Sequence, residues 1–293
     1  MPMNYKITHS TQYSYNNVVN LCHNEARLTP RSFAQQVCTQ SEFTVDPEPA
    51  SYRERKDFFG NTVCYFSIQR PHQDLSVTVT SHVEVKDRET HQDIAKRVAW
   101  EVVRERLHTD QDAETLEIRQ YIFDSPMIQD MSELRIYAES SFTKGRSLME
   151  AVEDLIERLY EDFAYDPGFT TVATPLAEVI KHRRGVCQDF AHLGIGCLRS
   201  MGLAARYVSG YIETIPFSDD EKLIGADASH AWFSVNFPDI GWIDFDPTNN
   251  QIPTNRHITV AWGRDYSDVT PFKGVVFGSG THELSVSVDC RAV

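Results

Sequence analysis

A chain of 293 residues is long enough to bury the core of one large domain or of two ordinary ones. Hydrophobic residues make up 41% and charged residues 24% of the chain, which excludes large-scale disorder and a fibrous protein. The formal net charge of -14 disfavours a nucleic acid or an anionic membrane as the main partner, because an acidic surface repels both.

The start of the chain lacks the charged and apolar segments of a signal peptide, and no stretch approaches about 18 consecutive apolar residues. We therefore expect a cytoplasmic protein that does not enter a membrane. The six cysteines form no CxxC pair and have no regular spacing, which favours free thiols over a disulfide framework or a zinc knuckle. No DxDxDG-type calcium loop occurs, and we expect neither a metal nor another cofactor.

Alternating side chains dominate the first part of the chain. Between residues 5 and 86, polar residues alternate with β-branched or aromatic ones, as in residues 76–85 (SVTVTSHVEV), and this period of two is typical of strands. Turn-forming residues at 46–49 (DPEP) and 59–61 (FGN) separate the runs. The pattern predicts a β-rich N-terminal domain over residues 1–90, with antiparallel strands packed as a sandwich.

Charged, helix-favouring segments follow, and we predict a helical connector over residues 91–143 with helices at 94–107 and 113–123. The clearest helix of the chain comes next, at residues 148–163, where acidic residues occupy the face opposite an apolar stripe. Pro175 opens a shorter helix. The stripe consists of Leu148, Val152, Leu155, Ile156, Leu159, Tyr160 and Phe163.

Residues 185–202 predict a buried helix that has Cys187 in its first turn and Gly202 as its C-terminal cap. Cys197 lies on the apolar face of this helix, and we interpret it as a core residue. Helices therefore precede strands in a domain over residues 144–293, an order typical of the α+β class. We assign five strand-like runs to this domain: 205–213, 230–237, 241–246, 257–262 and 282–289.

Cys187 is the candidate nucleophile. A thiol attacks carbonyl groups well only when it is ionised, and the N-terminus of a helix favours the thiolate through its free N–H groups and positive dipole end. Gly185, just before it, would let the backbone turn tightly into the helix and leave the sulfur accessible.

A thiol nucleophile also needs a base and a group that orients the base. His230 begins an alternating strand, a rigid position from which its imidazole can point toward a helix end. Asp246 ends the next strand and is the candidate that holds the imidazole in one tautomer. Strand alternation places Asp244 on the same face as Asp246, so the residues alone leave both aspartates open for this role.

A second interpretation of the same segment is a zinc site built from Cys187, His192 and a distant cysteine or histidine. Cys-x4-His at a helix start is not a usual pair of zinc ligands, which argues against this alternative.

Three segments resemble the three motifs of the transglutaminase-like superfamily: residues 185–192 (GVCQDFAH), 229–232 (SHAW) and 241–248 (GWIDFDPT). The resemblance covers roughly residues 144–250. It implies a papain-like α+β core, with the cysteine on a helix and the histidine and aspartate on neighbouring strands of an antiparallel sheet. The expected fold is therefore this core, preceded by the β-sandwich-like N-terminal domain.

The flanking segments are similar to bacterial members of the superfamily. Residues 5–15 (YKITHSTQYSY) and 57–61 (DFFGN) resemble their β-rich N-terminal region. Residues 261–269 (AWGRDYSDV) resemble their tail, and we expect this segment to continue the core sheet.

The resemblance favours Asp246 over Asp244 and implies a catalytic triad of Cys187, His230 and Asp246. Gln188 stands where animal transglutaminases have Trp after the nucleophile, which weakens the transfer of cross-linking activity. The implied function is a thiol-dependent hydrolase or acyltransferase that acts on peptide or glutamine-type amide bonds of a peptide or protein substrate, through a thioester. A cross-linking transglutaminase and a non-catalytic binding protein that keeps the fold are the alternatives.

Stabilisation of the tetrahedral intermediate needs hydrogen-bond donors at the oxyanion. The backbone N–H of Cys187 is expected to supply one of them. A second donor is not assigned by the sequence, and Tyr165 is a candidate for it.

Overall fold

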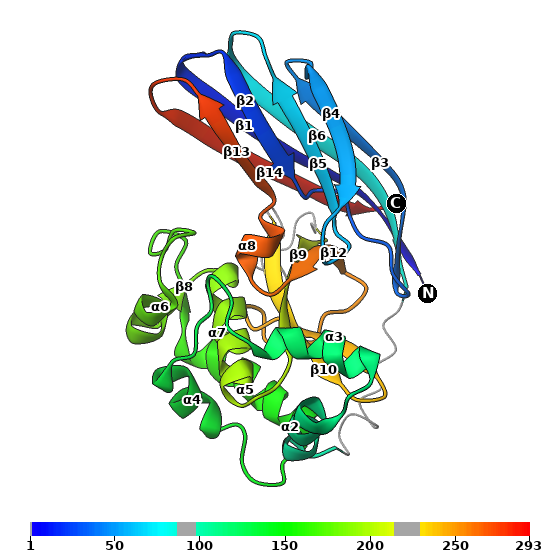
Figure 1. Ribbon diagram of the computed structural model, residues 1–293, viewed down its shortest axis with the longest axis vertical. Coiled ribbons are helices and arrows are strands. Elements are labelled where there is room, and N and C mark those ends of the chain that lie inside the picture. Colours follow the sequence, from blue (N-terminus) through cyan, green and yellow to red (C-terminus); the bar gives the residue numbers. More distant parts are fainter. Residues whose placement is uncertain (1, 87–97, 214–228) are drawn as a thin grey trace.

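The computed structural model describes residues 2–86, 98–213 and 229–293, and all statements on the structure refer to these ranges. A β-sandwich forms one end of the molecule, and helices packed around a smaller sheet form the other end (Figure 1). Helix α8 (Tyr266–Val269) lies where the two parts meet (Figure 1).

Two antiparallel four-stranded sheets form the sandwich, in the orders β14-β1-β6-β3 and β13-β2-β5-β4. Alternation in the sequence explains this packing, because β6 buries every second side chain along most of its length. The predicted sandwich is thus confirmed. The strands are β1 (Met3–Val19), β2 (Leu21–Ala26), β3 (Gln36–Asp46), β4 (Ser51–Lys56), β5 (Thr62–Ile68), β6 (His72–Val85), β13 (Phe272–Phe277) and β14 (His282–Ala292).

The two C-terminal strands belong to the sandwich, and our assignment of residues 282–289 to the catalytic core was wrong. Strand β14 pairs with β1 along almost its whole length, from Tyr5 opposite Ala292 to Tyr15 opposite His282. Strand β13, which the sequence did not predict, pairs with β2. The alternation of a strand indicates which face is buried but not which strand it pairs with, so this error concerns the partner and not the strand.

The second sheet has the order β11-β10-β9-β12, and all of its pairs are antiparallel. Strands β10 and β12 flank β9 and therefore run in the same direction, which places their first residues at the same end of the sheet. The predicted strands are confirmed. Of the tail segment 261–269, which we expected to continue this sheet, only residues 261–263 do so in β12, whereas residues 266–269 form helix α8. The strands are β9 (Ala205–Ile212), β10 (His230–Phe237), β11 (Gly241–Phe245) and β12 (His257–Gly263).

Helices cover the second sheet, with α7 packed against β10 and β9 (Figure 1). The start of α5 follows from its sequence, because Ser147 accepts a hydrogen bond at Oγ from the backbone N–H of Glu150 and caps the helix. The helices are α2 (Trp100–Thr109), α3 (Ala113–Arg119), η1 (Gln120–Ile122), α4 (Ser132–Glu139), α5 (Leu148–Asp162), α6 (Leu176–His182) and α7 (Cys187–Ser200).

The segment that we predicted as a helical connector is built into the part of the molecule that contains the second sheet. Its buried side chains Val103, Leu107, Leu134 and Ala138 pack in the same hydrophobic cluster as those of α5 and α7. Helix α4 contacts α7 directly. The predicted boundary at residues 90 and 91 and the start of the predicted helix at 94 lie outside the described residues.

Polar contacts join the sandwich to the second sheet. The guanidinium groups of Arg31, from the sandwich side, and Arg206, from β9, lie 3.5 and 3.9 Å from the centre of the Trp262 ring. The buried amide of Gln36 on β3 pairs with the backbone of Thr259 on β12, donating from Nε2 at 2.7 Å and accepting at Oε1 at 2.8 Å. The side-chain amide of Gln36 thus makes the two hydrogen bonds that a neighbouring strand would make at the free edge of β12.

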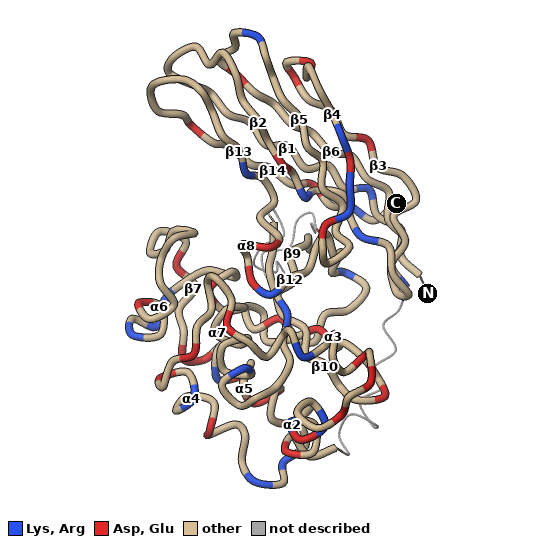
Figure 2. The backbone as a smooth tube through the Cα atoms, in the orientation of Figure 1, with Lys and Arg blue, Asp and Glu red and all other residues tan. Residues whose placement is uncertain are grey.

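Basic and acidic residues are interspersed over both parts of the described chain (Figure 2). Strand β4 carries three basic residues, with Glu54 between the first two. Within the described residues, no helix is both long and apolar enough to cross a membrane. The expectations of a cytoplasmic location and of no nucleic-acid or membrane partner stay predictions.

Candidate functional site

Cys187 is the first residue of α7 and is only partly buried, as the sequence predicts. Its helix begins with a local hydrogen bond, because the backbone N–H of Val186 donates to Oδ2 of Asp189 at 2.9 Å. Thr170 also donates its hydroxyl to this oxygen, at 2.7 Å. The turn before the thiol is therefore fixed by a carboxylate in the first turn of the helix.

Gly185 serves this turn in a different way from the one we predicted. A Cβ at this position would lie 2.7 Å from Oδ2 and 2.8 Å from Cβ of Asp189. Glycine is required because the capping carboxylate lies directly against its Cα, and the backbone does not enter the left-handed region here. The close approach lets Asp189 reach the N–H of Val186.

Gly194 lets α7 approach the second sheet. A Cβ on Gly194 would lie 2.4 Å from the ring of Phe233, which comes from the middle of β10. Helix and strand therefore pack with no side chain between the helix backbone and the ring. This contact sets the distance between the helix that starts with Cys187 and the strand that starts with His230.

His230 and Asp246 form a buried pair. Nε2 of His230 lies 2.9 Å from Oδ2 of Asp246, and both side chains are fully excluded from solvent. Strand pairing explains the contact: Phe233 on β10 lies opposite Phe245 on β11, so Asp246 directly follows the strand next to His230. The expectation that the two residues come from adjacent antiparallel strands is confirmed.

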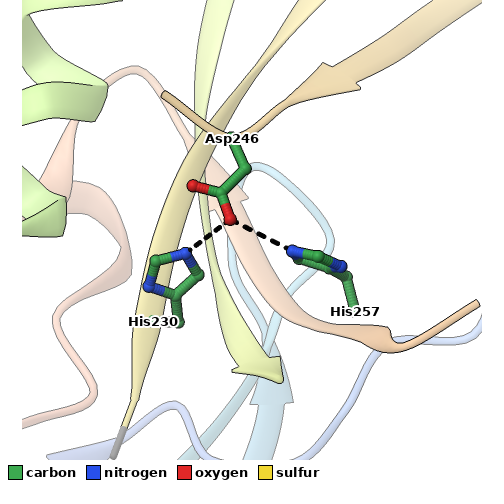
Figure 3. Close-up of side chains that lie close together, drawn as sticks. All are labelled: His230, Asp246 and His257. Atoms are coloured by element: carbon green, nitrogen blue, oxygen red, sulfur yellow. Dashed lines mark hydrogen bonds and ion pairs between the residues drawn. The ribbon is translucent and has the colours of Figure 1, made fainter. Parts of the chain in front are cut away.

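The carboxylate of Asp246 is held by donors on both of its oxygens. Oδ1 accepts from the backbone N–H groups of Thr248 and Asn249, at 3.0 and 3.2 Å. Oδ2 accepts from the side-chain amide of Asn249 at 2.8 Å and from Nε2 of His257 at 3.2 Å, in addition to His230. Figure 3 shows the two imidazole rings on either side of this one oxygen.

These contacts determine the charges of the pair. Burial alone would raise the pKa of Asp246, yet the charge and hydrogen bond of His230, and then those of His257, hold that pKa well below its usual range. Burial alone would lower the pKa of His230, but the charge and hydrogen bond of Asp246, followed by the nearby Cys187 thiol, raise that pKa above the ordinary histidine value. The favoured state is an imidazolium beside a carboxylate.

Cys187 lies close enough to His230 to contribute to this shift of the pKa. Nε2 of the ring is engaged with Asp246, so Nδ1 is the nitrogen that remains for the thiol. Among the described residues, no atom completes a hydrogen bond to the buried Nδ1, so the thiol and the ring are neighbours and not bonded partners.

Asp244, the competing aspartate, is turned to a different partner. Its Oδ1 accepts a hydrogen bond from the hydroxyl of Ser234, the residue opposite it on β10. His192 is also engaged elsewhere, because its Nε2 accepts from the backbone N–H of Tyr266 at 3.1 Å.

His257 is a member of the site that our sequence reasoning missed. It is the first residue of β12, as His230 is the first residue of β10. The order of the strands in the sheet would have indicated it. Strands β10 and β12 flank β9 and begin at the same end, so their first residues lie near each other. A lone histidine at a strand start carries no such information until the pairing is known.

The ligand atoms of His230, Asp246 and His257 lie within 4.8 Å of one another, a spacing that would also suit a metal ion. Each of these atoms takes part in the hydrogen bonds described above, and we assign no metal to them. Among the described residues, Cys187 and His192 are not part of any such group, so the predicted zinc alternative has no set of ligands here.

Tyr165 lies next to the turn that leads to Cys187. It belongs to β7 (Ala164–Tyr165), which pairs in parallel with β8 (Arg184–Gly185), so Tyr165 is directly opposite Gly185. Burial and then the charge of Cys187 raise the pKa of its hydroxyl. Tyr165 thus lies beside the turn that precedes Cys187, and 38% of the residue stays exposed.

A helix-borne cysteine against an antiparallel sheet that carries a buried His–Asp pair defines the class of papain-like α+β proteins with a transglutaminase-like core. Profiles of known families match both parts of the chain: the bacterial transglutaminase-like N-terminal region matches residues 5–84, and the transglutaminase-like superfamily matches residues 137–247. The chain belongs to the transglutaminase-like superfamily.

Relatives cover almost the whole chain. An uncharacterized protein of Mycobacterium tuberculosis strain H37Rv is 40% identical over 297 aligned residues, which cover 97% of this chain and 91% of that protein. An uncharacterized protein of Mycobacterium leprae is 35% identical and covers 97% of both chains. A crystal structure from Cytophaga hutchinsonii, described as a "Putative Cysteine Protease", has a TM-score of 0.80 at 22% identity and covers 100% of this chain and 91% of that one. This last likeness concerns the fold.

Proposed function

We propose that this protein is a thiol-dependent hydrolase or acyltransferase that cleaves peptide or glutamine-type amide bonds through a thioester on Cys187. The observation that carries the proposal is the buried His230–Asp246 pair, 2.9 Å apart, beside a partly exposed thiol at the start of a helix. A buried ion pair of this kind is costly to form, and perturbed titratable groups gather at functional sites.

The first half of the proposed reaction forms the thioester. The thiolate of Cys187 attacks the carbonyl carbon of the amide, and the imidazolium of His230 gives its proton to the nitrogen as the carbon–nitrogen bond breaks. An amine leaves, and the acyl group stays on the sulfur. Asp246 keeps Nε2 of the ring protonated throughout, so that the proton is transferred from Nδ1.

The second half releases the acyl group. Once the sulfur is acylated, its negative charge no longer supports the imidazolium, so the pKa of His230 falls and the ring can act as a base. It takes a proton from water or from an amine, which attacks the thioester carbon, and the sulfur leaves as the thiolate. Water gives hydrolysis, whereas an amine gives acyl transfer.

Donors at the oxyanion support both halves. Cys187 is the first residue of α7, so its backbone N–H has no acceptor within the helix and can point to the oxyanion. A donor of this kind contributes about 3 kcal/mol to catalysis. Tyr165, opposite Gly185 and beside the turn that precedes Cys187, is our candidate for the second donor.

Two observations support hydrolysis of peptide bonds over cross-linking. Gln188 follows the nucleophile, where animal transglutaminases have Trp. The structure of the same fold from Cytophaga hutchinsonii is described as a "Putative Cysteine Protease".

The test is a panel of peptides and glutamine amides incubated with the wild-type protein and with Cys187→Ala, each with and without a primary amine. We expect amide cleavage by the wild type only, with a free acid as the main product when the amine is absent. An amine-dependent product without any hydrolysis would instead favour transglutaminase activity. No turnover of any substrate by a protein whose Cys187 is also no more reactive than a free thiol would favour a binding protein.

A further inference from the structure

His257 is the remaining buried histidine at the site, and the proposed reaction does not use it. Only 1% of its surface is exposed. Its ring packs edge-on against Trp232 at 5.2 Å between ring centres, and it lies 6.3 Å from the ring of His230. An aromatic wall thus fixes the plane of the imidazole.

Both histidines donate to the same oxygen. Nε2 of His230 lies 2.9 Å and Nε2 of His257 lies 3.2 Å from Oδ2 of Asp246. A carboxylate only accepts hydrogen bonds, so each Nε2 carries a proton in this arrangement. His257 is therefore a donor to the group that orients the base.

The strand that carries His257 is held from both sides. On one side His257 lies opposite Ile212 in the pairing of β12 with β9. On the other side the amide of Gln36 bonds the backbone of Thr259, two residues further along β12. His257 is thus mounted on a strand whose position the N-terminal sandwich helps to fix.

We propose that His257 is a positioning residue of the thiol site, which keeps Asp246 an ionised and fixed acceptor so that Nδ1 of His230 stays directed toward Cys187. The inference rests on the proposed function of the site, and it assigns a fourth side chain to it.

A pH dependence follows from this role. His257 is one of the donors that hold the pKa of the buried Asp246 down, so its loss lets Asp246 take up a proton at higher pH. A protonated Asp246 no longer supports the imidazolium of His230. The titratable groups that face His257 among the described residues are His230 and Asp246, with the ion pair of Arg256 and Glu213 beside the start of β12.

Alkylation of Cys187 by iodoacetamide, measured against pH, tests the inference without a substrate. We expect His257→Leu to move the acidic midpoint of the alkylation profile upward by about one pH unit, the value that corresponds to losing one hydrogen bond to a charged group. His257→Gln should restore most of the wild-type profile, because its amide nitrogen can donate where Nε2 does. His72→Leu, which removes another buried histidine in the sandwich, should leave the profile unchanged.

The outcomes separate this inference from the proposed function. A wild-type profile in His257→Leu overturns the inference while the reactive thiol remains. An equal shift in the Leu and Gln variants also overturns it, because packing and not the hydrogen bond would then matter. A wild-type thiol that reacts no faster than a free cysteine contradicts the proposed function itself.

Nuclear magnetic resonance of the wild-type protein with ¹⁵N-labelled histidine gives a second measurement, which remains possible if His257→Leu does not fold. The inference requires that His257 carries its proton on Nε2 at neutral pH. A proton on Nδ1 alone would overturn it.

Discussion

Asp244 and Asp246 lie two residues apart at the end of one strand, yet the first accepts a hydrogen bond from Ser234 and the second from His230. The same conservative substitution at the two positions therefore makes a matched pair. We expect Asp246→Asn to slow alkylation of Cys187 at neutral pH at least about tenfold, because an amide can hold the ring in the wrong tautomer and removes the charge. Asp244→Asn should stay within about twofold of the wild type. Equal effects of the two substitutions on the rate would contradict the role of Asp246.

The six cysteines provide a test of nucleophile identity. Cys197 is fully buried on α7, and burial raises the pKa of its thiol to about 12, whereas Cys187 is partly exposed at the start of the same helix. With limiting iodoacetamide near pH 7, we expect mass spectrometry to find the label on Cys187. Cys187→Ser should abolish this rapid labelling, and Cys197→Ser should not change it. Slow labelling spread over several cysteines would speak against an activated thiol.

The phenol of Tyr165 can be tested by removing one oxygen atom. If this hydroxyl donates to the oxyanion, Tyr165→Phe should lower kcat about tenfold to a hundredfold with little change in KM, because the interaction forms in the transition state. The alkylation rate of Cys187 should stay close to the wild-type value, since alkylation forms no oxyanion. A lower alkylation rate would indicate that the substitution disturbs the thiol and not the oxyanion.

Because His9 is buried, we expect the folded protein to lose stability in acid. Its ring is buried between Thr11 and the hydroxyl of Tyr211 on β9, and burial lowers its pKa from 6.5 to about 4. The unfolded chain binds this proton more readily than the folded one, so the stabilisation is complete above about pH 6.5 and is lost as the pH falls toward 4. The contribution is on the order of 3 kcal/mol. In urea unfolding at pH 7 and pH 4.5, His9→Gln should lose less stability between the two values than the wild type does.

The amide of Gln36 makes two hydrogen bonds to the backbone of Thr259 and joins the sandwich to the second sheet. Gln36→Leu has a similar volume and leaves the buried N–H of Thr259 without its partner, while the C=O of Thr259 still accepts from the backbone N–H of Arg31. The substitution should lower the free energy of unfolding by about 1 to 3 kcal/mol. Gln40→Leu, at an exposed position of the same strand, is the control and should change it by less than about 0.5 kcal/mol. If both variants lose the same free energy of unfolding in urea, the hydrogen bonds between Gln36 and Thr259 do not contribute to stability.

Local features of this fold could be predicted from the sequence because they depend on neighbours in the chain. The apolar stripe of α5 and the strand at residues 230–237 follow from their own side chains. Gly202 has a φ of 78° just beyond the end of α7, as a residue after a helix end often does. The conformation at such positions depends on residues that are only a few places away in the sequence.

Pairing between distant strands could not be predicted in the same way. Strand β13 contains Gly274, a residue that is rare in strands, and most of its side chains are exposed. Gly274 lies opposite Asn24 on β2 and lets that side chain approach its backbone closely, a contact between strands that are far apart in the sequence. The contribution of His257 was missed for the same reason, since it depends on the order of four strands and not on any local motif.

Because β13 and β14 belong to the sandwich, the sandwich can be completed only late in the synthesis of the chain. Strand β1 has β14 as one of its two neighbours, and β14 is synthesised only after the residues of the thiol site. During synthesis, each sheet of the sandwich keeps an unpaired edge strand until the residues of the thiol site have been made. We therefore expect that the N-terminal half does not fold as an independent domain. Loss of β14 would make β1 an edge strand, to which another protein chain could pair.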